Sequence, residues 1–540
     1  MEAPIIPICK RLFLASVLSI AVAAPAQADV ARRADPVADY MQARVADADG
    51  DVTTAIAGYA RALAARPADA TVALRAYREA LAAGDIPLAT RAAAVLRDQP
   101  GAPADLALLP LALAAARNDA AGAEAATQSL ARTPLSVMVP ALRAWIAYSR
   151  GGNPSAPIIA ANVGSTPVAQ RLAAETAALL QIAMGDVQGG LRGVQALRET
   201  GSPVDLRLSA AQLLFGTGHP DEARALLAGD DPALAALRQG SPAKPTLAYG
   251  VSRLLARVAG DLVDQDVAPL SIALTRTALV ASPANDRARL LLAQALAGED
   301  ATDQALATLD AVPASSPFAS TAIAARISIL ARADRTADAL ALARRDAERA
   351  DAGPAAWQLY ADQLTTAGNN AEAARWYRRI AEAQPAAWNA WLQYGGALEQ
   401  AGDWPAARAA LKKAVALAPA EPLALNYLGY AQAERRVDVP ASIAMLQRAH
   451  AAKPDDASIA DSLGWALFVN GDTARALPLI ERAAEAEPTN AEIAEHLGDV
   501  YWALGRRYEA RYAWRAAALT APAQDAAALA TRIAQGPPAR

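Results

Sequence analysis

The sequence predicts an all-α protein built as a solenoid of antiparallel helix pairs, and three observations lead to this prediction. Hydrophobic residues make up 54% of the chain but aromatic residues only 5%, so alanine and leucine fill most apolar positions. Alanine favours closely packed helices, because it loses no side-chain entropy in a helix. An internal repeat recurs every 34 residues over half of the chain. Most copies also hold a turn and a closing proline, and a fixed period of this size is typical of solenoids.

The first 28 residues have the features of a secretory signal peptide. A basic pair, Lys10 and Arg11, precedes the apolar run Leu12–Ala24, and Ala-Gln-Ala at 26–28 supplies a cleavage pattern. The run is shorter than the roughly 20 residues of a membrane span, and no later segment reaches that length. We therefore expect cleavage after Ala28 and a periplasmic mature chain without a membrane span. The alternative is an uncleaved N-terminal anchor.

The sole cysteine, Cys9, lies before the apolar run. A lipoprotein's acylated cysteine instead follows that run and becomes the mature N-terminus, so Cys9 cannot have this role. Cleavage after Ala28 would leave a mature chain without disulfides or thiol chemistry.

The repeats are most regular in the second half of the chain. Their starts are 34 residues apart, except for one interval of 35 between Pro422 and Ala457. The copies begin near Ser252, Asp286, Ser320, Pro354, Trp388, Pro422, Ala457 and Ala491. In each copy a small residue is expected where the second helix crosses the first, since a large side chain there would separate the helices. A proline then ends the second helix in most copies, because proline cannot continue a helix.

One copy carries almost the full pattern of a known repeat. Its residues are Trp391, Tyr394, Gly395, Leu398, Ala407, Leu411, Ala414 and Pro419. On these residues the chain is identified as a member of the tetratricopeptide-repeat (TPR) family. The resemblance implies a right-handed superhelix of about 12–14 repeats, with a concave face that binds peptides.

Composition divides the mature chain into four stretches. Residues 29–227 form a block of degenerate repeats, and residues 246–522 form the regular block. Residues 228–245, rich in glycine and proline, are expected to be an irregular connection. Residues 523–540 should hold a final helix, which covers the apolar end of the stack, and a disordered tail.

The sequence contains none of the common catalytic, phosphate-binding or metal-binding motifs. Glu495 and His496 are adjacent, but neighbouring residues on a helix point about 100° apart and do not face each other. The formal net charge is −4 and no basic tract occurs, which argues against nucleic acid as a partner. We therefore expect a protein that is not an enzyme and needs no cofactor or metal.

The last three repeats place aromatic side chains and carboxylates at the positions that line the concave face of TPR proteins. The predicted groove residues are Asn426, Tyr430, Asp461, Trp465, Phe468, Glu492, Glu495, Asp499 and Trp502. Aromatic residues supply large contact area at low entropy cost and are frequent hot spots of binding. The alternative is that the aromatic side chains pack against neighbouring helices. TPR proteins that bind chaperones use Lys, Arg and Asn at such positions, so the resemblance does not extend to them.

The extra residue of the 35-residue interval falls within a polar turn at 433–440. It is either tolerated drift in a loop or a protruding contact loop.

Three strings in this region resemble a group of proteobacterial envelope TPR proteins. They span 426–430, 461–465 and 496–502, and the likeness continues from Glu509 to Trp514. Some members of that group are outer-membrane lipoproteins that bring a periplasmic carboxyl-terminal processing protease to cell-wall hydrolases. The present sequence lacks their lipoprotein cysteine.

The sequence thus indicates a periplasmic scaffold that binds envelope proteins, such as a protease or a cell-wall hydrolase, without a reaction of its own. One alternative is a structural component of an exopolysaccharide export or other envelope assembly machine. Another is a cytosolic TPR regulator, which would require that residues 1–28 are not a signal peptide.

Overall fold

The computed structural model describes residues 35–161, 166–199, 204–229, 232–263, 265 and 267–537. The predicted signal peptide, residues 1–28, lies outside this part of the chain, as does the end of the predicted tail. All regular elements in the described ranges are helices, which confirms the all-α prediction. Six helix pairs precede the short helix α13 (Pro232–Leu237) and eight pairs follow it. None of the described helices is long and apolar enough to span a bilayer.

Residue contacts divide the chain into two compact units, Met1–Leu109 and Pro110–Arg540. In the first unit, each helix begins after an aspartate whose carboxylate accepts backbone N–H groups of the first turn, which satisfies donors that a helix start leaves unpaired. Its helices are α1 (Pro36–Ala48), α2 (Val52–Ala65), α3 (Ala70–Ala83) and α4 (Ile86–Leu96). The Tyr77 hydroxyl and the Arg78 guanidinium both bind the Asp105 carboxylate, at 2.9–3.0 Å, which anchors the segment after α4.

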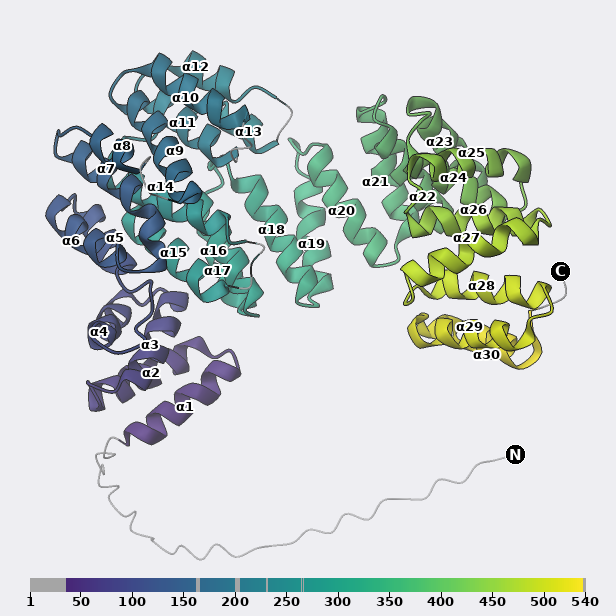
Figure 1. The fold of residues 1–540 in the computed structure, drawn as a ribbon, viewed down its shortest axis with the longest axis horizontal. Helices are drawn as coiled ribbons and strands as arrows, with labels where there is room; N and C mark the ends of the chain where they lie inside the picture. Colours follow the sequence, from purple (N-terminus) through teal and green to yellow (C-terminus); the bar gives the residue numbers. More distant parts are fainter. Residues whose placement is uncertain are drawn as a thin grey trace, which may run out of the picture. The chain divides into compact units, whose positions relative to one another are not determined.

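The second unit continues the helix pairs as far as the chain is described (Figure 1). The helix α5 (Leu108–Ala116) crosses the boundary between the units. The first half of the second unit then holds α6 (Ala120–Leu130), α7 (Val139–Ser149), α8 (Ser155–Ala161), α9 (Pro167–Ala183), α10 (Val187–Glu199), α11 (Val204–Gly216), α12 (Pro220–Leu226), α13, α14 (Leu247–Gly260) and α15 (Ala268–Ala281). The second unit also contains two 3₁₀ helices, Pro134–Met138 and Ala523–Asp525.

The regular repeats follow as α16 (Asp286–Gly298), α17 (Thr302–Asp310), α18 (Ala319–Arg332), α19 (Thr336–Ala347), α20 (Pro354–Thr366), α21 (Asn370–Ala383), α22 (Trp388–Gln400), α23 (Trp404–Leu417), α24 (Pro422–Glu434), α25 (Val439–Ala452), α26 (Ala457–Val469), α27 (Thr473–Ala486), α28 (Ala491–Ala503), α29 (Arg507–Thr520) and α30 (Ala526–Gln535). Six first helices begin at the residues where the sequence places repeat starts, and these are α16, α20, α22, α24, α26 and α28. The repeat predicted near Ser252 begins earlier, with α14 at Leu247.

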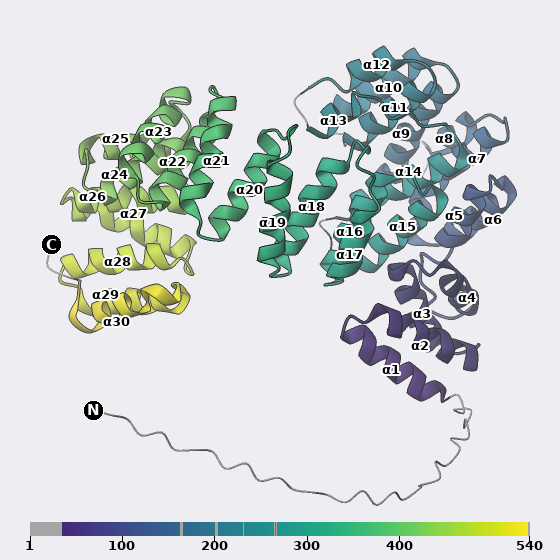
Figure 2. The ribbon, with the colours of Figure 1, turned by 180° about the vertical axis from the view of Figure 1, so that it is seen from behind.

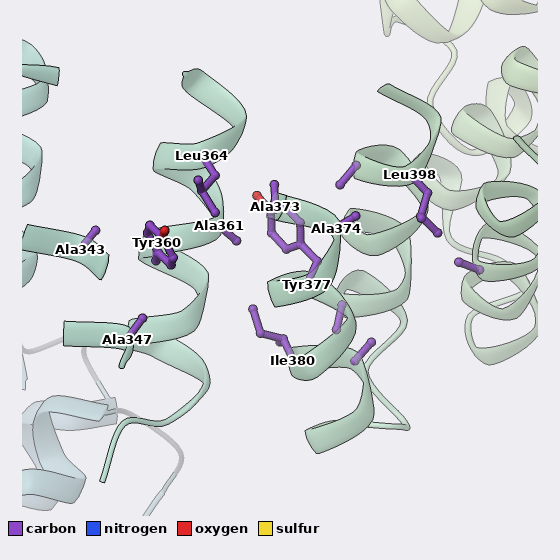
Figure 3. Packing of buried hydrophobic residues seen from close by; sticks show 14 of the residues in the cluster. Ala343, Ala347, Tyr360, Ala361, Leu364, Ala373, Ala374, Tyr377, Ile380 and Leu398 are labelled. Atoms are coloured by element: carbon purple, nitrogen blue, oxygen red, sulfur yellow. The ribbon is translucent and has the colours of Figure 1, made fainter. Parts of the chain in front are cut away.

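Small residues allow the two helices of a repeat to approach closely. A Cβ on Gly464 would lie 2.5 Å from Ile480 Cγ1, and one on Gly395 would lie 2.7 Å from Leu411. Buried alanines of α19, α20 and α21 pack in one cluster with Tyr360 and Tyr377. Figure 3 shows this for Ala343, Ala361 and Ala373. Alanine at these positions lets neighbouring helices approach closely, so a core with few large side chains can still be closely packed.

The stretch 228–245 contains α13, which the sequence analysis did not predict, and its Ala243 N–H donates to the Gln212 carbonyl of α11 at 2.9 Å. α14 then packs against α7 as well as against α15 and α16 (Figure 1). The division of the chain into two compact units falls between Leu109 and Pro110. The block boundaries predicted from composition stay a prediction.

Helices α26 to α30 follow one another in both views (Figures 1 and 2), and α30 packs on α29. α30 lies within residues 523–540, where the sequence predicts a final helix. Its Leu529 is 1% exposed and packs with Ala494 and Ala517. The longer turn after α24 is built with Arg436 and Asp438 in the left-handed region, at φ 52° and 55°.

Candidate protein-binding surface

Several predicted groove residues meet around His496 of α28, a residue that the sequence analysis did not include. The imidazole Nδ1 of His496 lies 2.9 Å from Oδ2 of Asp461, and both side chains are about nine-tenths buried. The Trp465 ring stacks on the imidazole, with centroids 3.9 Å apart and an interplanar angle of 15°. Because α26 carries Asp461 and Trp465, one helix supplies both the charge partner and the stacking partner of His496.

Two hydrogen bonds extend this cluster to α24. The Tyr430 hydroxyl donates to the Glu492 carboxylate, which links α24 to α28 across the intervening α26. The Trp465 indole N–H donates to Glu434 Oε2 at 2.6 Å. The first helices of three successive repeats are therefore joined by side chains on one face. We call this set, Tyr430, Glu434, Asp461, Trp465, Glu492 and His496, the His496 cluster.

The aromatic members of the predicted groove are more buried than an open groove would leave them. Trp465 is 8% exposed and Phe468 6%, and their rings lie 5.4 Å apart. This is the packing that the sequence analysis gave as the alternative for the aromatic residues. Tyr430 and Asn426 are half-buried, whereas Glu434 and Glu492 are exposed. The exposed members of the His496 cluster are therefore two carboxylates, and the half-buried Tyr430 donates to one of them.

The remaining predicted residues form a separate group next to α30. Asp499 is 6% exposed and accepts from the Trp514 indole at 3.2 Å and from Arg532 at 3.1 Å. Arg532 also pairs with Glu495, at 2.6 Å. The Arg507 guanidinium lies 3.7 Å from the centroid of the half-buried Trp502 ring. Asp499, Glu495 and Trp502 thus hold the end of the solenoid together, and their assignment to protein binding stays a prediction.

The His496 cluster perturbs the groups within it. Burial lowers the pKa of His496, but Asp461, through its charge and its hydrogen bond, and the carboxylates of Glu492 and Glu434 outweigh burial and raise that pKa above 6.5. Burial and the Glu492 carboxylate raise the pKa of Tyr430. Both shifts keep protons on groups that donate to carboxylates.

In the sequence, Glu495 is the acidic neighbour of His496. Its actual partner, Asp461, lies 35 residues earlier on the first helix of the preceding repeat. Polar residues one repeat apart are the signal that would have identified this pair, since first helices of successive repeats are adjacent. Within the described residues, no group of three or more His, Cys, Asp or Glu side chains is arranged to hold a metal ion.

A second exposed surface was not predicted. Tyr508 and Tyr512 of α29 are 79% and 69% exposed, and with Tyr501 they line a cavity of about 430 Å³ between α27, α28 and α29.

The repeat pattern is matched by known proteins. A model of the tetratricopeptide-repeat family matches residues 366–422, 395–457 and 462–527. The chain therefore carries tetratricopeptide repeats in this region, as the sequence predicts. No curated protein matches this chain.

Three of the solved structures that match this chain are a tetratricopeptide repeat protein, the Cut9–Hcn1 hetero-tetramer and MamA. A TPR protein from Parabacteroides merdae is 16% identical, with a TM-score of 0.38, and the match covers 45% of this chain and 94% of that one. The Cut9–Hcn1 hetero-tetramer of APC/C is 15% identical, with a TM-score of 0.37, over 93% of this chain and 97% of that one. MamA is 26% identical, with a TM-score of 0.26, over 30% and 93%. The identification rests on the family match and on the helix pairs.

Proposed function

We propose that this chain is a non-catalytic scaffold of the periplasm that binds proteins through the face of α24, α26 and α28. TPR proteins bind protein partners, and this face combines a rigid framework with exposed chemistry. The observation that carries the proposal is the His496 cluster, in which the Tyr430 hydroxyl binds Glu492 and the Trp465 indole binds Glu434. Carboxylates around an aromatic ring suit a partner segment that carries arginine or lysine, because such charges attract and orient a basic chain.

Capture of partners from a periplasmic extract tests this function. The bait is the mature chain, and the test variant is Glu434→Gln with Glu492→Gln, which removes two charges but keeps hydrogen-bonding groups. The control is Glu382→Gln, which removes an exposed carboxylate paired with Arg378 on α21. We expect wild type and control to retain the same partner and the double variant to bind it at least about tenfold more weakly. Equal capture by all three proteins would show that this face does not bind the partner.

The periplasmic location is tested separately by mass spectrometry of the protein purified from its native host. We propose that the mature chain begins at Asp29, because residues 1–28 have the basic region, apolar run and cleavage pattern of a signal peptide. An intact N-terminus in a soluble cytosolic fraction would instead support the regulator alternative. The wider proposal, that the partner is an envelope protease or a cell-wall hydrolase, depends on the likeness at 426–430, 461–465 and 496–502.

A further inference from the structure

The tenth residue of the second helix carries a positive charge in five successive repeats and none in the next repeat. Counted from the helix starts of α19, α21, α23, α25 and α27, these residues are Arg345, Arg379, Lys413, Arg448 and Arg482. The same count in α29 gives Ala516. The repeat formed by α28 and α29 therefore lacks a charge that its predecessors carry.

In two of these repeats, the arginine side chain contacts the preceding repeat. The Arg448 guanidinium of α25 donates to the carbonyl of Pro419, in the turn that follows α23. The Arg482 Nη2 of α27 lies 3.0 Å from the His450 Nε2 of α25. A guanidinium thus links the second helix to the repeat before it at both places.

Between α27 and α29 the equivalent residues are small, and a cavity lies beside them. Ala516 is the equivalent of Arg482, and Ala484 is the equivalent of His450. Both alanines line the cavity of about 430 Å³, as does Pro488, the equivalent of Pro419. This volume is in the range of ligand pockets, which measure about 300–1,000 Å³. The cavity therefore lies where the two preceding repeats hold an arginine.

The charged residues of the cavity wall are carboxylates. Glu487 and Glu509 line it, and Arg506 pairs with Glu509 at 3.0 Å. Glu487 is half-buried and accepts from the Asn490 side chain at 2.9 Å, but it forms no ion pair with any described residue. One carboxylate in the wall therefore has no positive partner.

The rest of the wall suits the other parts of an arginine side chain. The exposed rings of Tyr508 and Tyr512 offer aromatic faces, which attract a guanidinium. Leu497, Ala494 and Ala513 supply apolar surface, against which the hydrocarbon stem of an arginine can pack.

We propose that this cavity binds an arginine side chain of a partner protein. The guanidinium pairs with Glu487 and occupies the place that Arg448 and Arg482 fill in the preceding repeats. Tyr508 and Tyr512 offer contact area beyond the cavity itself, which favours a protein segment over a free small molecule. The cavity shares no residue with the His496 cluster, so this site is separate from the proposed protein-binding face of α24, α26 and α28.

Fluorescence anisotropy of the mature chain with a labelled pentapeptide, Ser-Leu-Arg-Leu-Ser-amide, tests the proposal. The matched peptide contains citrulline in place of arginine, which keeps the shape and removes the charge. We expect the citrulline peptide to bind at least about tenfold more weakly. Absence of binding by the arginine peptide, or equal binding of both peptides, would overturn the proposal. N-acetylarginine amide that competes as well as the unlabelled pentapeptide would show a small-molecule site instead.

Two variants locate the binding. Ala516→Arg places the arginine of the preceding repeats in the cavity and should weaken the pentapeptide at least about tenfold, whereas Ala518→Arg adds the same charge at an exposed position of α29 and should not. Glu487→Gln removes the carboxylate without filling the cavity and should also weaken binding. Circular dichroism verifies the fold of each variant. Wild-type affinity in folded Ala516→Arg or Glu487→Gln would show that the peptide binds elsewhere.

A last variant separates this site from the proposed function. Glu434→Gln with Glu492→Gln alters the His496 cluster and leaves the cavity intact, so it should bind the pentapeptide as wild type does. Loss of binding in this double variant would place the peptide on the face of α24, α26 and α28 and would overturn the assignment to the cavity.

Discussion

His496 is the residue on which the polar organisation of the last repeats depends. Its buried imidazole stacks against the Trp465 ring and pairs with the Asp461 carboxylate. A buried ion pair adds little net stability compared with an apolar pair, but removal of one partner leaves the other charge uncompensated. The packing of α24, α26 and α28 is therefore expected to depend on the charge of the His496 imidazole.

The pH dependence of stability follows from the sign of the shift. Burial lowers the pKa of His496, but Asp461, Glu492 and Glu434 raise it above the ordinary value of 6.5. The folded protein then holds the proton more tightly than the unfolded chain, so protonation stabilises the fold. This contribution is complete below the unfolded pKa of 6.5 and is lost as pH rises through the folded pKa.

We expect His496→Gln to destabilise the protein most at acidic pH, by about 3 kcal/mol, and less as pH rises. Urea unfolding between about pH 5.5 and pH 9, followed by tryptophan fluorescence, measures the difference. His219→Gln, a change at a partly exposed histidine on another repeat, is the control and should leave the profile of wild type unchanged. Parallel pH profiles for wild type and His496→Gln would contradict the assignment of the charge.

At the scale of the helix pair, the close approach of α28 and α29 depends on Gly498. A Cβ at this position would lie 2.3 Å from Nε1 of Trp514, which is fully buried and donates to Asp499. The indole cannot move away without losing that bond. Glycine is therefore needed where α28 and α29 cross, because no larger side chain fits there.

Gly498→Ala should destabilise the last repeat by about 2 kcal/mol, because overpacking displaces Trp514. The comparison is Gly298→Ala at the end of α16, where a Cβ meets no atom within 4 Å. That change should be neutral or stabilise by up to about 1 kcal/mol, since alanine restricts the unfolded chain. Thermal unfolding followed by circular dichroism ranks the two proteins. Equal melting temperatures would show that the helices can move apart at the crossing without cost.

At the scale of the whole chain, each repeat packs on its neighbours, so stability is transmitted from repeat to repeat. The last repeat has a neighbour on one side, and α30 covers its other side with Leu529 and pairs Arg532 with Glu495 and Asp499. Deletion of residues 526–540 should cost at least about 2 kcal/mol locally, from loss of Leu529 burial.

Hydrogen exchange measures the effect of this deletion. We expect faster exchange in α28 and α29, with no change in α1 to α4, because coupling between repeats is local. Leu519→Ala is the control, since Leu519 lies at the same end but is 86% exposed. Uniformly faster exchange along the chain would mean that the solenoid unfolds as one cooperative unit.

The sequence by itself determined the fold class, the repeat family and the starts of helices such as those at Pro354, Trp388 and Ala491. These features depend on local chemistry, because periodicity, turn residues and prolines act within one repeat. The tertiary structure decided which side chains of different repeats meet. Asp461 and His496 are 35 residues apart, Tyr430 and Glu492 are 62 apart, and Glu175 and Arg253 are 78 apart. Such contacts depend on the rotation that accumulates from repeat to repeat, which no single copy of the repeat encodes.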